Sequence, residues 1–79
     1  MTVYYTFIVK VTNGDNFGDV EEFMNKILKV EVGEVREVDY INKYRITIDV
    51  EDGFDFGHFE DCMDNAGYDT ELLWEDRIP

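Results

Sequence analysis

The sequence contains one cysteine, few basic residues and no long apolar run, and each shortage excludes a class of protein. Cys62 alone cannot form a disulfide within the chain or build a cysteine-rich zinc site, which fits a reducing compartment. No apolar stretch reaches the roughly 18 residues of a membrane-spanning helix, and the amino terminus lacks a signal-peptide pattern. We therefore expect a cytoplasmic protein that does not bind a membrane.

The shortage of basic residues gives a net charge of −12, from seven Lys and Arg against 19 Asp and Glu. Binding to nucleic acid or to an anionic membrane requires a basic surface, so neither is expected as a direct partner. The imbalance is also uneven. Residues 1–45 contain eight acidic and six basic residues, whereas residues 46–79 contain eleven acidic residues and a single cation, Arg77. The expected partner is a basic protein, and the second half of the chain carries most of the field that would attract it.

Apolar residues are plentiful by contrast. A hydrophobic content of 44%, with 15% aromatics, predicts a folded chain rather than a disordered acidic tail, and 79 residues predict one domain spanning 1–79. The domain contains an internal repeat at an offset of 39 residues, which divides it into pseudo-repeats of approximately 3–39 and 42–78. The identical pairs are Tyr5/Tyr44, Val11/Val50, Gly14/Gly53, Phe17/Phe56, Gly18/Gly57, Glu21/Glu60 and Met24/Met63.

Each pseudo-repeat begins with strict apolar alternation, over residues 3–11 and 44–50, which is the period of a strand with one buried face. A glycine turn follows, and then Asn16 or Asp55 stands where a helix N-cap is expected. The apolar spacing next changes to about 3.6 residues and predicts helices over 16–29 and 55–66. In the first of these helices the apolar stripe expected to face the core consists of Phe17, Val20, Met24, Ile27 and Leu28. Two further strands are predicted over 34–40 and 70–76, with Gly67 ending the second helix.

The resulting order is βαββαβ. Two βαβ units with right-handed crossovers form a four-stranded antiparallel sheet of order 4-1-3-2 with both helices on one face, so the expected class is α+β and the expected arrangement is ferredoxin-like. Bulky aromatics that alternate along strands are usually core residues, and Tyr5, Tyr44 and Trp74 are expected to pack there.

No motif for catalysis, metal or cofactor binding is found, so we expect neither an enzyme nor a cofactor. His58 is expected to be solvated, and Cys62 to be a small buried apolar residue. An EF-hand loop with Gly53 at its sixth position would place Ile48 at the first ligand position, where a carboxylate is needed. Weak calcium or magnesium binding by Glu51, Asp52 and Asp55 remains an alternative. The glycines of "GDNFG" do not match a phosphate-binding loop.

The second helix is unusually acidic. In the first helix Glu22 precedes Lys26 by four residues, a favourable spacing for an ion pair, but Asn65 stands at the position equivalent to Lys26. Asp61 and Asp64 therefore share a solvent-facing side without a cation. One interpretation is a solvated face kept acidic for solubility. We predict an acidic surface that attracts a basic groove, formed by Asp52, Asp55, Glu60, Asp61, Asp64, Asp69, Glu71, Glu75 and Asp76.

The expected function is that of a small non-enzymatic binding protein that blocks a basic, nucleic-acid-binding protein. In size, charge and lack of catalytic motif the chain is similar to phage anti-CRISPR and anti-restriction proteins, some of which mimic nucleic acid and act in the host cytoplasm. The alternative is a dimeric ligand-binding or regulatory ferredoxin-like module that associates through its open sheet face, with Tyr4, Ile8 and Leu73 at the interface. A third interpretation, adaptation to high salt, is disfavoured by the seven Lys and Arg that remain.

Overall fold

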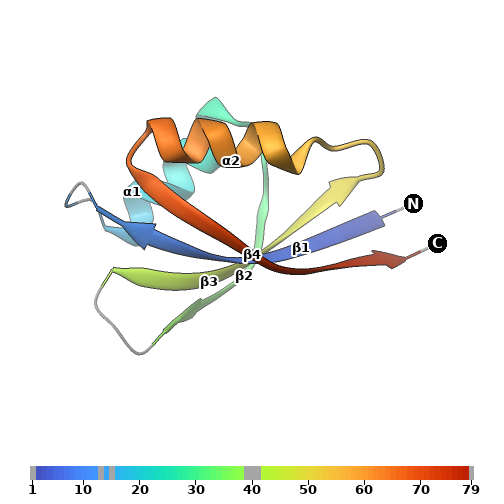
Figure 1. Cartoon of the computed structure of the whole chain (residues 1–79), viewed down its shortest axis with the longest axis horizontal. Coiled ribbons are helices and arrows are strands. Elements are labelled where there is room, and N and C mark those ends of the chain that lie inside the picture. Colours follow the sequence, from blue (N-terminus) through green and yellow to red (C-terminus); the bar gives the residue numbers. More distant parts are fainter. Residues whose placement is uncertain (1, 13, 15, 39–41, 79) are drawn as a thin grey trace.

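The computed structural model describes residues 2–12, 14, 16–38 and 42–78. It has an α+β fold in which the elements follow the predicted order (Figure 1). Of the turns expected between elements, residues 13, 15 and 39–41 lie outside the described part of the chain. The elements are β1 (Thr2–Val11), α1 (Phe17–Glu22), a π-helix η1 (Phe23–Ile27), β2 (Val32–Glu37), β3 (Lys43–Glu51), α2 (Phe56–Asn65) and β4 (Tyr68–Ile78).

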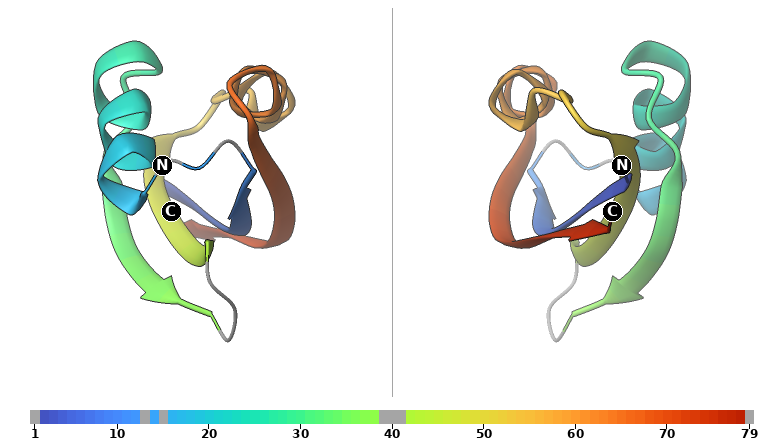
Figure 2. Two further views of the ribbon diagram at one scale, coloured as in Figure 1. Left: turned by 90° about the vertical axis from the view of Figure 1, so that its left-hand side faces the viewer. Right: turned by 90° about the vertical axis from the view of Figure 1, so that its right-hand side faces the viewer.

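The four strands form one antiparallel sheet of order β2-β3-β1-β4, so β1 and β3 lie at its centre and β2 and β4 at its edges. Counted from the β4 edge, these neighbours read 4-1-3-2. Both helices cover the same face of the sheet (Figure 1), which curves around them (Figure 2). We call this the helix face, and the opposite side the open face. In the described residues, none of the helices is both long and apolar enough to cross a membrane.

The core lies between the helix face and the two helices. Alternate residues of β1, from Val3 to Val11, point into it because successive side chains of a strand alternate between faces. β3 contributes Ile46 and Ile48, and the helices contribute Val20, Met24, Phe56, Phe59 and Met63. The Phe7 ring meets the rings of Phe56 and Phe59 edge-on, with centroids 5.5 and 5.4 Å apart. This aromatic cluster fixes α2 over β1.

The helix ends follow the sequence signals closely. Asn16 caps α1, with its side chain accepting from Asp19 N at 3.0 Å, and Asp19 accepts in return from Asn16 N. Asp55 caps α2, accepting from His58 N at 3.0 Å. Gly67 ends α2 with φ +91°, a left-handed conformation that favours glycine. The predictions for both caps and for the helix stop are confirmed.

The first helix differs from the prediction in its last turns. After Glu22 the chain widens into the π-helix η1, where Leu28 N donates to Phe23 O rather than to the carbonyl of residue 24. Each π turn contains one residue more than an α turn, so the residues beyond it rotate away from the expected apolar stripe. Ile27, predicted to be buried, is therefore 65% exposed, and the helical segment ends at 27 instead of 29.

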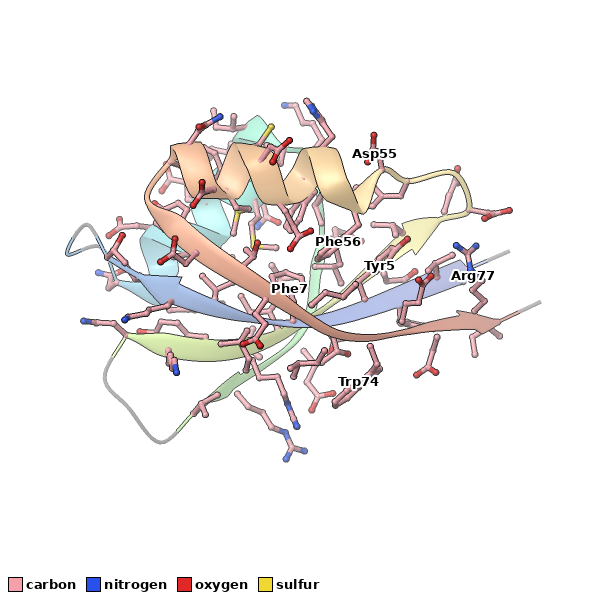
Figure 3. All side chains as sticks on the ribbon, in the orientation of Figure 1. Tyr5, Phe7, Asp55, Phe56, Trp74 and Arg77 are labelled. Atoms are coloured by element: carbon pink, nitrogen blue, oxygen red, sulfur yellow. The ribbon has the colours of Figure 1, made fainter. Side chains whose placement is uncertain are left out.

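The last strand differs as well. It is longer than the predicted 70–76, and its register with β1 shifts between Thr6 and Phe7, which pair with Trp74 and Leu72. Leu73 is the extra residue of this bulge, and the residues after it change faces. Trp74 therefore lies on the open face, 48% exposed, and its prediction as a core residue was wrong (Figure 3). Tyr5 is buried and Tyr44 is partly buried against the core, as expected.

Candidate functional site

Four carboxylates line a shallow groove between α2 and β4. Glu60, Asp61 and Asp64 come from α2, Asp69 comes from the start of β4, and Thr70 completes a lining that encloses about 380 Å³. We call these four carboxylates the acidic groove. The chain brings them together because Gly67 turns it back directly after the helix, with Gly67 N donating to Asp64 O at 3.0 Å. Asp69 consequently lies beside the last turn of α2.

The carboxylates of the acidic groove form no ion pair within the described part of the chain, although Lys10 of β1 lies opposite Asp69 in the sheet. Lys26 pairs with Glu22 in α1 at 3.3 Å, but none of the ion pairs found among the described residues includes Glu60, Asp61, Asp64 or Asp69. Like charges three and four residues apart on a helix destabilise it by a few tenths of a kcal/mol for each pair. The three carboxylates of α2 therefore form a negative site that an external cation would stabilise.

A lysine at position 65 provides a direct test of this repulsion. Asn65→Lys places a cation four residues after Asp61 and in the last turn of α2, where positive charge is favourable. We expect the free energy of unfolding to rise by about 0.5 kcal/mol, measured by urea denaturation at low salt. The gain should shrink in 1 M NaCl, and Asn65→Gln is the neutral control. An equal gain from both variants would contradict the electrostatic account.

Asp52, Asp55 and Glu75, also predicted for the acidic surface, lie apart from the groove and are engaged within the chain. Arg77 contacts Asp52 at 2.6 Å and Glu75 at 3.2 Å, and Figure 3 shows its side chain near the end of the sheet. The hydrogen bond to Asp52, together with the two negative charges, raises the pKa of the Arg77 guanidinium above its ordinary value. Asp55 is occupied by its capping role.

Glu71 and Asp76 lie on the other side of the sheet. They pair with Ile8 and Tyr4 of β1, whose side chains occupy open-face positions. The nine predicted carboxylates thus divide into three groups: four in the acidic groove, three around Arg77 and the α2 N-cap, and two on the open face. Asp69 also pairs with an open-face residue, Lys10 of β1, but it stands at the start of β4 beside the end of α2 and therefore lines the groove.

His58 and Cys62 lie on one side of α2, with Nε2 and Sγ 3.7 Å apart. Both line an apolar groove of about 300 Å³ between the two helices, with Ile27 and Phe59 among its other residues. His58 is exposed, as expected, but Cys62 is only partly buried. Their four-residue spacing was the signal for this contact in the sequence. In the described part of the chain, no group of three or more His, Cys, Asp or Glu side chains is arranged to hold a metal ion.

The acidic groove is thus the described surface where four of the predicted residues gather without ion-pair partners, and its chemistry suits a cationic ligand. Comparison of the chain with protein-family models, with curated proteins and with solved structures finds no match.

Proposed function

We propose that this chain is a non-enzymatic binding protein that uses the acidic groove to engage, and thereby block, a basic nucleic-acid-binding protein. The observation that carries the proposal is the clustering of Glu60, Asp61, Asp64 and Asp69, none of which has an ion-pair partner among the described residues. Carboxylates held this way on a helix and an adjoining strand attract Lys and Arg, and occupy positions where such a partner would bind phosphates.

The location of the groove supports the same function. α2 is anchored to the sheet by Phe56, Phe59 and Met63, so three of the carboxylates project from a rigid element. A rigid surface loses little conformational entropy when it binds, which favours affinity. The remaining acidic residues of the chain add long-range attraction, which raises the association rate with a basic partner and weakens as salt increases.

We also propose that the fold is of the ferredoxin-like type, with the two pseudo-repeats related by a structural duplication. The order of elements and the antiparallel sheet with both helices on one face support this assignment. Equivalent positions of the two halves also have equivalent roles: Asn16 and Asp55 cap their helices, and Met24 and Met63 are fully buried. The duplication produces two similar helices, and α2 carries three of the four carboxylates of the acidic groove.

The experiment that tests the function is an affinity capture from bacterial lysate with the purified chain, followed by mass spectrometry. We expect a nucleic-acid-binding protein to be retained at low salt, released at high salt, and displaced by duplex DNA or RNA. Asp61→Asn with Asp64→Asn should lower the affinity for that protein at least about tenfold, which corresponds to about 1.4 kcal/mol, and should flatten its salt dependence.

The matched control is Glu21→Gln with Glu31→Gln, which removes the same charge away from the groove. This control should bind nearly as well as the native chain. Equal losses of affinity in both variants would show that net charge alone determines binding. Unchanged affinity of the Asp61/Asp64 variant would refute a role for the acidic groove.

A further inference from the structure

The open face of the sheet has a different charge pattern from the helix side. β3 places five residues there, in alternate positions, and they read Lys43, Arg45, Thr47, Asp49 and Glu51. Two cations precede Thr47 and two carboxylates follow it, at matching distances along the strand. Because a strand rises about 3.4 Å per residue, Arg45 and Asp49 each lie about 7 Å from Thr47, in opposite directions. The charge pattern thus changes sign about Thr47.

The neighbouring strands place further side chains around the same point. Thr6 of β1 pairs with Thr47, and their hydroxyl oxygens are 3.0 Å apart. Tyr4 and Ile8 lie two residues before and after Thr6, so apolar side chains flank the centre symmetrically. Trp74 of β4 pairs with Thr6 on the other side. The row Thr47, Thr6 and Trp74 therefore crosses the sheet at the point where the charge reverses.

Trp74 provides an apolar centre for contact. Its side chain is 48% exposed and projects from the open face, away from the helices (Figure 3). The guanidinium carbon of Arg45 lies 6.0 Å from its ring centroid, which holds both groups on the same surface. Tyr4 and Ile78 add further exposed apolar area, at 36% and 50% exposure. An exposed apolar patch bordered by charges is typical of an interaction surface.

We propose that a second copy of this chain docks on the open face, with the strands of the two copies antiparallel and the two-fold axis along the row Thr47, Thr6 and Trp74. Rotation about this axis sets each strand against its own reversed copy. Arg45 then faces Asp49 of the second copy, Tyr4 faces Ile8, and Trp74 lies against Trp74. Such a self-complementary contact is what a two-fold dimer requires, and aligned packing of two sheets is common.

On the central strand β3, charge favours this occupant over an unrelated acidic or basic protein, because Lys43 and Arg45 face Glu51 and Asp49 of the second copy. At the edges of the sheet the same rotation sets Glu71 against Asp76 and Glu34 against its own copy, so these carboxylates oppose association and the contact rests on the two central strands and Trp74. The same orientation directs the acidic grooves of the two copies outward, on opposite sides of the assembly. Two sheet-and-helix layers then separate them by more than a Debye length, about 8 Å at physiological salt, so their mutual repulsion is screened. The inference goes beyond the proposed function and does not depend on it.

Sedimentation velocity on the purified chain tests the proposal. We expect a concentration-dependent species of twice the monomer mass of 9.3 kDa. Arg45→Asp and Asp49→Arg, each made alone, should raise the dimer dissociation constant at least tenfold. The double variant, Arg45→Asp with Asp49→Arg, should restore the native value, because each exchanged charge again faces its opposite.

These variants separate specific pairing from general repulsion. Asp49→Arg lowers the net negative charge, so general repulsion predicts tighter association, whereas the proposed pairing predicts weaker association. Circular dichroism establishes that each variant is folded, and Trp74→Ala, which removes a half-exposed side chain, provides a second disruptive variant. A native chain that stays monomeric up to 1 mM would overturn the proposal, and so would a folded double variant that fails to recover dimerisation.

Discussion

Replacing Phe7 by alanine is expected to destabilise the fold by about 3–5 kcal/mol. Phe7 is fully buried and its ring contacts Phe56 and Phe59 of α2. A domain of this size has a free energy of unfolding of about 4–12 kcal/mol, so the variant should be marginally folded at best. Urea denaturation followed by circular dichroism measures the loss.

Trp74→Ala is the matched control for Phe7→Ala. Trp74 is the larger side chain, but it is half exposed because the bulge at Leu73 places it on the open face. We expect its loss to be less than half of that for Phe7→Ala, measured at low micromolar protein so that association does not contribute. Similar losses of unfolding free energy at the two positions would contradict the assignment of the bulge and would indicate that Trp74 is a core residue.

Met63→Ala is the second substitution with a large expected effect, about 2–5 kcal/mol. Met63 of α2 is fully buried, and Met24 of η1, its equivalent in the first pseudo-repeat, is fully buried as well. We expect Met24→Ala to cost a comparable amount, since both helices are attached to the same sheet. Leucine at either position keeps most of the volume and should cost less than about 1.5 kcal/mol.

The comparison between the two methionines tests the structural duplication. A large loss at Met63 with a loss below about 1 kcal/mol at Met24 would mean that the first helical segment contributes little to the core. The two halves of the chain would then be unequal in stability, in spite of their similar sequences. Chevron analysis of the same variants would show whether the halves also differ in when they form.

The elements of the fold were predictable because several independent signals agree in this sequence. Alternation marks β1 and β3, caps at Asn16 and Asp55 mark the helix starts, and Gly67 marks a helix end. Each signal is local, and local signals are the most reliable part of a sequence-based prediction. The repeat added the order of the elements, because two equal βαβ units admit few arrangements.

The differences from prediction come from single inserted residues. A π turn after Glu22 rotated Ile27 out of the core, and the bulge at Leu73 moved Trp74 to the open face. Neither insertion has a sequence signature, because both are fixed by packing between elements that are distant in the chain. The acidic site was also only partly predictable: charge could be counted from the sequence, but the face on which each carboxylate of β4 lies depends on the register of the sheet.

The position of β4 at the edge of the sheet gives its carboxylates a further role. An eleven-residue edge strand with Leu72, Leu73 and Trp74 exposed is a template on which strands of other chains could stack into fibrils. Glu71, Glu75 and Asp76 flank this apolar stretch and would be forced together in every added layer. At neutral pH we expect this repulsion to oppose self-templated aggregation of the chain.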